Sequence, residues 1–176
     1  MRSIVSILVV ASAAVAAALV APQPAMAVTL GTCPLGTSTV TYTPGITDTP
    51  QEVFQEGFEQ SGVCVFTPLT LRSFTTSFSG FLTTSCTDLL GEDEGEQTFF
   101  WSDGKESYWE FNSITSTDAN GNVVATYTGT LSLDSEYYPG AHVQQVVTYT
   151  NLDLDSCDQD PITEQSGTST YVFASV

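Results

Sequence analysis

The residues that could act as acid, base or nucleophile are few. His142 is the single histidine of the 176-residue chain, so serine or cysteine catalysis with a histidine base would depend on it alone. It stands between Ala141 and Val143 in an alternating segment whose apolar residues face the core. The alternation places His142 on the outer face, and we expect a surface histidine rather than a member of a catalytic triad.

Carboxylates are the other candidate catalysts, because the chain contains 20 Asp and Glu residues. Glu106 and Glu110 share the outward face of a predicted strand with Tyr108, where they could flank a groove. A glycosidase needs two carboxyl groups at a defined separation beside a sugar cleft, and so acidic a chain supplies carboxylate pairs by chance. We predict no catalytic residue and no enzyme activity, with a carboxylate-dependent hydrolase as the weakest alternative.

Two acidic clusters, residues 92–96 and 153–160, could in principle hold calcium, which takes several oxygen ligands from a flexible loop. The second cluster is not an EF-hand, because the glycine and the closing glutamate of that motif are absent. Asp160 also precedes Pro161, which favours an ordinary turn. We expect solvated acidic loops, no metal ligand and no cofactor; a calcium site in the second cluster remains the alternative.

Aromatic residues offer a further possible site. Trp101, Tyr108 and Trp109 could form a platform for a sugar or another ring-bearing ligand, but Trp101 and Trp109 fall on the inward face of their strands, which favours a core role. If the predicted barrel is open inside, these aromatics and the inward-facing Gln145 could line a small pocket.

The elements that must position these residues are β-strands, because Thr, Ser, Val, Tyr and Phe alternate between Gly, Pro, Asn and Asp turns with no helical periodicity. From Ser73 to Cys86, the odd positions are Ser or Thr apart from Phe81, whereas Phe74, Phe78, Leu82 and Cys86 all fall on even positions, so one face is buried. We predict about eight strands: 37–43, 51–59, 73–86, 96–101, 105–115, 122–133, 142–150 and 167–174.

The hairpin turns can be tested against the core pattern, because residues paired across two strands point to the same face. A three-residue loop between Trp101 and Lys105, with a left-handed Gly104, puts Gln97 opposite Trp109. A loop over residues 119–121 puts Trp109 beside Leu131 and Phe111 beside Gly129. The resulting inner face contains Phe99, Trp101, Trp109, Phe111, Val123, Ala125, Tyr127, Leu131, Leu133, Val143, Val147 and Tyr149.

The strands form an antiparallel up-and-down meander, and closure into a barrel is the preferred architecture because it removes exposed edges. A two-sheet β-sandwich is the alternative. We predict a single all-β domain over residues 28–176.

Residues 1–27 have the three-part pattern of a secretory signal peptide: Arg2, an apolar run from Ile4 to Val20, and a small-residue cleavage site at Ala25–Ala27. We therefore expect a secreted, extracellular protein. Four cysteines follow the predicted cleavage site, an even number that predicts two disulfides in an oxidising compartment. Three connectivities are possible, and we favour Cys33 with Cys64 and Cys86 with Cys157.

Charge excludes some partners. After cleavage only Arg72 and Lys105 would remain against 20 acidic residues, too few basic groups to neutralise phosphates, so we expect no binding of nucleic acid or of membranes. We expect a monomer whose partner is an unknown extracellular ligand or protein.

Several scaffold motifs resemble a group of uncharacterised secreted β-rich proteins of actinobacteria: residues 33–36, 39–45, 101–104, 138–141 and 166–170. The resemblance implies an exported bacterial β-protein with no established activity, and it transfers no functional residues. We expect a non-enzymatic extracellular binding or interaction module, with a structural component of the cell envelope as the alternative.

Overall fold

The computed structural model describes residues 27–89, 92–117, 122–150, 152, 154, 157 and 159–175, with the side chains of residues 92 and 93 left aside. The described chain is all β, and it contains no helix long and apolar enough to cross a membrane. Nearly all of the predicted signal peptide, the predicted turn at residues 118–121 and most of the second acidic cluster lie outside the described residues.

Ten strands follow one another along the chain. They are β1 (Val28–Ile46), β2 (Gln51–Gln60), β3 (Cys64–Phe66), β4 (Thr70–Arg72), β5 (Phe74–Thr84), β6 (Glu92–Trp101), β7 (Glu106–Thr117), β8 (Val123–Leu131), β9 (His142–Tyr149) and β10 (Ile162–Ser175).

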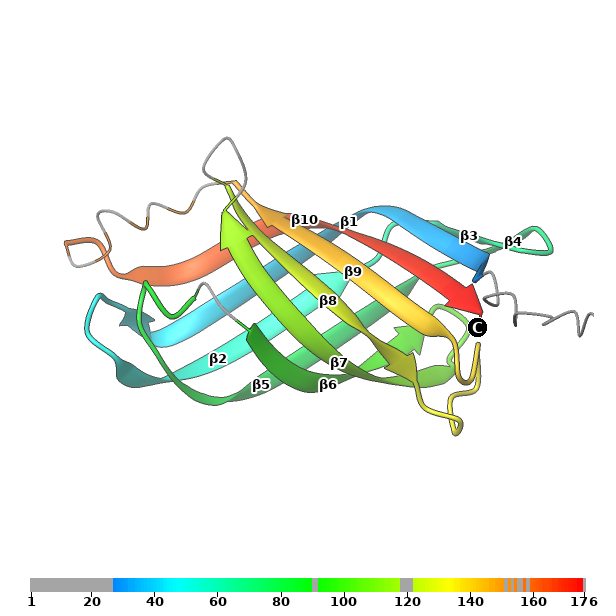
Figure 1. The fold of residues 1–176 in the computed structure, drawn as a ribbon, viewed down its shortest axis with the longest axis horizontal. Helices are drawn as coiled ribbons and strands as arrows, with labels where there is room; N and C mark the ends of the chain where they lie inside the picture. The colour runs from blue at the N-terminus through cyan, green and yellow to red at the C-terminus, as the bar shows by residue number, and fades with distance from the viewer. Residues whose placement is uncertain are drawn as a thin grey trace, which may run out of the picture.

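Eight of these strands close into an antiparallel barrel, which confirms the predicted fold class. The order around the barrel is β1-β2-β5-β6-β7-β8-β9-β10, and β10 pairs back onto β1 over most of their length. The short β3–β4 hairpin pairs with the N-terminal part of β1 and projects beyond one end of the barrel (Figure 1). The β-sandwich alternative is therefore wrong.

The registers of two hairpins follow the inner-face argument. The backbone N–H of Trp101 donates to Lys105 O at 2.9 Å, and Gly104 has the left-handed φ of 84° that the three-residue turn requires. Gln97 pairs with Trp109 across β6 and β7, and Trp109 pairs with Leu131 across β7 and β8. The predicted inner residues of these strands accordingly point into the barrel.

Three predicted features need correction. Alternation predicts Leu133 on the inner face, but β8 ends at Leu131 and the side chain of Leu133 is 83% exposed in the following turn. The first predicted strand, 37–43, is only the middle of β1, whose N-terminal half contains register shifts that break the alternation. The β3–β4 hairpin is absent from the predicted strands, because three-residue strands are too short to show a period.

Two disulfides tie the strands together. Cys33 of β1 is bonded to Cys64 of β3, and Cys86, after β5, is bonded to Cys157, between β9 and β10. All four residues are buried, and this is the pairing favoured from the sequence. The first disulfide fixes the β3–β4 hairpin to the wall, and the second ties two connecting segments at the opposite end of the barrel.

The interior divides into two halves with different contents. The packed half, at the end with the β6–β7 and β8–β9 turns, is filled by interlocking aromatic rings: Phe66, Phe74, Phe99, Trp101, Trp109, Tyr171 and Phe173. Phe74 and Phe99 stack at 4.3 Å between ring centroids, and Phe74 meets Tyr171 edge-on at 4.9 Å. The hollow half, at the end with Cys86 and Cys157, has smaller buried clusters around a cavity.

Candidate functional site

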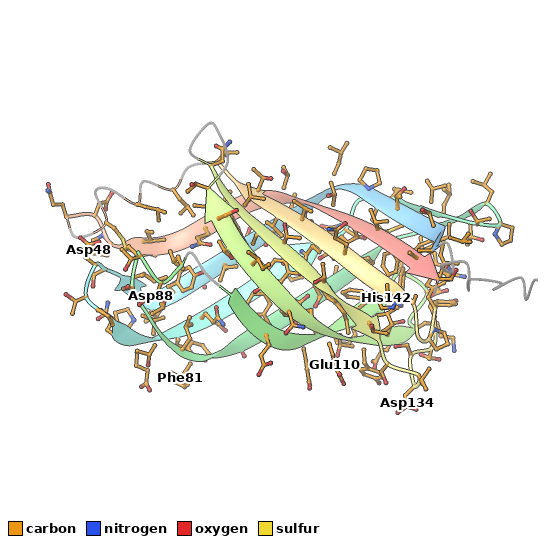
Figure 2. All side chains as sticks on the ribbon, in the orientation of Figure 1. Asp48, Phe81, Asp88, Glu110, Asp134 and His142 are labelled. Atoms are coloured by element: carbon orange, nitrogen blue, oxygen red, sulfur yellow. A yellow bond between two sulfur atoms is a disulfide. The ribbon has the colours of Figure 1, made fainter. Side chains whose placement is uncertain are left out.

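The residues weighed in the sequence as candidate catalysts lie on the outer face of the barrel, as expected from the alternation. His142 is exposed on the outer face of β9, where its Nδ1 lies 3.4 Å from Thr130 Oγ1. Glu106 is half-buried and Glu110 exposed on the outer face of β7, and Glu106 Oε2 accepts a hydrogen bond from the Tyr108 hydroxyl at 3.0 Å. In Figure 2 Glu110 and His142 point outward from different strands.

The aromatic platform is also divided. Trp101 and Trp109 are 3% and 0% exposed and belong to the packed half, whereas Tyr108 is 42% exposed on the outer face. Trp101 Nε1 donates to Ser107 Oγ at 2.9 Å, which satisfies the indole within the core. The core interpretation of the two tryptophans is confirmed.

Among the described residues, the one group with metal-ligand spacing is Asp48 with Cys86 and Cys157. Both cysteines are joined in a disulfide, so neither offers a thiolate. Of the two acidic clusters, residues 153–160 lie mostly outside the described chain, while Glu94 and Glu96 of the first cluster are exposed.

Among the described residues, a cavity of about 320 Å³ in the hollow half could receive a ligand. All eight barrel strands contribute to its wall, and the lining is mixed. Its apolar and aromatic part consists of Val40, Tyr42, Phe78, Leu82, Phe111, Val123, Ala125, Tyr127 and Tyr149; its polar part includes Gln55, Thr84, Gln97, Ser113, Thr115 and Gln165. Small-molecule pockets have volumes of roughly 300–1,000 Å³, so this cavity suits a small ligand.

Two glycines help to keep this half hollow. Gly57 on β2 faces Phe78 on β5, and a Cβ built on Gly57 would lie 2.1 Å from that ring. Gly95 on β6 faces Phe111 on β7, and its Cβ would lie 2.7 Å from that ring. Because these glycines have no side chain, both phenylalanine rings lie against the barrel wall over the glycine backbone, and they line the cavity instead of filling it.

The cavity reaches the surface through the wall between β5 and β6. These strands pair only at Phe74 with Trp101 and at Thr75 with Phe100, within the described residues, and beyond those pairs they diverge. We call this divergence the β5–β6 seam. Ser79, Glu94 and Glu96 are exposed on the outer faces of the two strands and still line the cavity, because the seam opens there.

Asp88, from the segment that joins β5 to β6, also lines the cavity. Figure 2 places Asp88 at the same end of the barrel as Asp48, while Asp134 and His142 lie toward the other end. Together Asp88, Glu94 and Glu96 form the acidic mouth of the cavity. All three are exposed, so the mouth is accessible to solvent.

A buried carboxyl group lies between the packed and hollow halves. Glu59 on β2 is 2% exposed and accepts hydrogen bonds from Ser38 Oγ at 3.2 Å, from Gln145 Nε2 at 2.5 Å and from the Tyr171 hydroxyl. Tyr171 belongs to the packed half. Ser38 Oγ also lies 3.5 Å from the hydroxyl of Tyr149, which lines the cavity.

Burial dominates the ionisation of these groups. It raises the pKa of the Glu59 carboxyl above its ordinary value, although the hydrogen bonds from Tyr171, Gln145 and Ser38 lower that pKa. Burial likewise raises the pKa of Tyr149 to about 12 and that of Tyr127 well above its ordinary value. The phenols in the cavity wall are therefore neutral at physiological pH and offer O–H groups rather than charge.

Sequence reasoning identifies Gln145 as a polar residue of the interior and misses others, among them Gln97 and Glu59. Gln145 is predicted on the inward face and is fully buried. Gln97 and Glu59 are not among the predicted buried groups, although Gln97 is paired with the inward Trp109, and Glu59 has the same parity on β2 as the buried Val53 and Gly57. The parity of each strand is the signal that could have located them.

Comparisons of this chain with protein-family profiles, with curated proteins and with solved structures gave no match.

Proposed function

We propose that this protein is a secreted, non-enzymatic binding protein that takes a small, partly apolar ligand into the cavity of its hollow half. The observation that supports this most is the contrast between the two halves of one barrel. A cluster of buried aromatic rings occupies one half, whereas the other half keeps about 320 Å³ free and opens through the seam. A barrel that served only as a rigid scaffold would gain stability by filling that space.

The lining suits a ligand with both apolar and polar parts. An apolar surface is formed by Val123, Ala125 and the rings of Phe78 and Phe111. Inward-facing amide and hydroxyl groups can fix the orientation of the ligand, as in most small-molecule pockets. Export is supported by the leader pattern of residues 1–27 and by two buried disulfides, which are compatible with an oxidising compartment.

The proposal can be tested with the neutral apolar dye N-phenyl-1-naphthylamine, whose fluorescence rises in an apolar site. We expect saturable binding to the wild-type protein and a higher melting temperature at saturating dye. Ala125→Phe should abolish dye binding, because Ala125 is 2% exposed and lines the cavity on β8.

Two further variants make this test specific. Phe81→Ala removes an exposed ring from the outer face of β5, which Figure 2 shows pointing away from the barrel, and should leave dye binding unchanged. Ala141→Phe adds the same bulk as the cavity variant, but in the packed half, and should lower the melting temperature more than Ala125→Phe does. Absence of saturable binding, or equal binding by a folded Ala125→Phe variant, would refute the proposal.

A further inference from the structure

The mouth of the cavity has charge of one sign. Asp88, Glu94 and Glu96 line it, and neither Arg72 nor Lys105 does. Both of those cations lie at the other end of the barrel, beside the β6–β7 turn, where Arg72 Nη1 is 2.6 Å from Asp103 Oδ2 and Lys105 pairs with Glu136. The charged side chains that line the described cavity are therefore all acidic, and they give it a negative potential.

A buried acceptor without a partner lies next to this mouth. Gln97 is 7% exposed, faces inward from β6 and lines the cavity, and its Oε1 has no hydrogen-bond partner in the described structure. Buried polar atoms are nearly always hydrogen-bonded, so an unmet carbonyl oxygen in a cavity wall indicates a missing donor. A water molecule or a ligand in the cavity can supply that donor.

Glu96 and Gln97 are consecutive residues at the β6 side of the seam, and successive side chains of a strand point to opposite faces. Glu96 is exposed at the mouth and Gln97 is buried in the wall behind it. A group that enters through the seam thus meets a carboxylate first and an unmet amide oxygen next. A protonated amine suits both, because it is positively charged and has only N–H donors.

We infer that the ligand class of this cavity is an amphipathic primary amine, with its apolar body among the rings and its ammonium group between Glu96 and Gln97. The inference rests on the proposed function and specifies its ligand. Anionic amphiphiles such as fatty acids are disfavoured, because they would bring a second negative charge to the mouth and have no donor for Gln97.

The experiment is a competition of three eight-carbon compounds against bound N-phenyl-1-naphthylamine at neutral pH: 1-octylamine, 1-octanol and octanoate. They have similar apolar bodies and carry charges of about +1, 0 and −1. We expect octylamine to bind roughly tenfold tighter than octanol, because attraction to a few exposed carboxylates contributes about this factor to a dissociation constant. Octanoate should bind weakest. Raising the ionic strength to about 1 M should reduce the preference, because screening acts on exposed charges.

Two matched variants show which residue causes the preference for the amine over the alcohol. Glu96→Gln should lower the preference for the amine over the alcohol severalfold, whereas Glu110→Gln should not. Glu110 pairs directly with Glu96 across β6 and β7, is exposed, and does not line the cavity, so both variants remove one charge from the same cross-strand pair. Gln97→Met should weaken the amine and the alcohol alike, because both donate a hydrogen bond.

The outcomes separate this inference from the function on which it rests. If the dye does not bind the wild-type protein, the proposed function fails. If the dye binds but octanol or octanoate displaces it as well as octylamine does, the binding function stands and the amine assignment is wrong. If Glu110→Gln reduces the preference as much as Glu96→Gln does, the preference comes from general surface charge, and the assignment to the mouth is overturned.

Discussion

Replacing Glu59 tests the arrangement of the barrel interior most directly. Its carboxylate is the common acceptor for Ser38, Gln145 and Tyr171, all inside the barrel. Glu59→Ala leaves these three donors without an acceptor, and each unmet buried group costs roughly 1–3 kcal/mol. We expect this variant to lose about 3 kcal/mol or more of its free energy of unfolding.

Glu59→Gln should be tolerated much better. Gln145 and Tyr171 both donate to Oε2, so the carbonyl oxygen of the substituted amide can take that position and keep both bonds. The Ser38 hydroxyl, which can donate or accept, can turn to accept from the new amide group. Because the substitution also removes a buried charge, we expect its free energy of unfolding to lie within about 1 kcal/mol of wild type at neutral pH.

The pH dependence has a defined sign. Burial raises the pKa of Glu59 above its ordinary value of 4.5, so the folded protein keeps this proton at pH values where the unfolded chain has lost it. Protonation therefore stabilises the fold: the contribution is fully present below the unfolded pKa and is lost as the pH rises through the folded pKa. The stability of wild type relative to Glu59→Gln should fall as the pH is raised from about 4.

Urea unfolding, followed by tryptophan fluorescence, gives the free energy of unfolding of each variant and its dependence on pH. The difference in free energy of unfolding between wild type and Glu59→Gln reports the titration of Glu59 alone, because the other carboxyl groups of this acidic chain are the same in both proteins. A difference that grows in favour of wild type with rising pH would show that the hydrogen bonds outweigh burial and would refute this reasoning. An unchanged stability of Glu59→Ala would refute the three-donor arrangement itself.

Two further predictions concern the wall and its connections. Replacing Cys86 and Cys157 by alanine should lower the free energy of unfolding, measured with urea, by roughly 4 kcal/mol, because this disulfide joins residues 71 positions apart and restricts the unfolded chain. A loss under about 1 kcal/mol would contradict that entropic explanation. Gly104→Ala should lower the free energy of unfolding by about 1 kcal/mol, because the φ of Gly104 is 84°, in the left-handed region. Gly80→Ala is the control: a Cβ at Gly80 would also lie in open space, and this substitution should change the free energy of unfolding by less. Equal effects of the two substitutions would contradict the strain argument.

The alternation of residues is enough to predict the barrel and much of its inner face. Parity places Phe99, Trp101, Trp109, Val143 and Val147 inward, and all are buried. Parity depends only on the backbone pleat, so it holds wherever a strand is regular. It fails for Leu133, which lies beyond the end of β8.

The cavity could not be predicted in the same way. Parity states that Phe78 and Phe111 face inward, but not whether their rings fill the interior or lie on the wall. That outcome depends on Gly57 and Gly95 on the neighbouring strands, and alternation alone does not define the register between β2 and β5. The seam is equally invisible, since β5 and β6 each alternate normally and only their pairing is missing.

The partial pairing of β5 with β6 has a consequence for how molecules exchange with the interior. Aromatic rings block one end of the barrel, and the Cys86–Cys157 bridge ties connecting segments across the other end. A small outward swing of β6, together with its paired neighbour β7, about the pairs Phe74 with Trp101 and Thr75 with Phe100 would widen the seam without breaking a β5–β6 hydrogen bond. Entry and exit would then be radial, through the side of the cylinder, rather than along its axis.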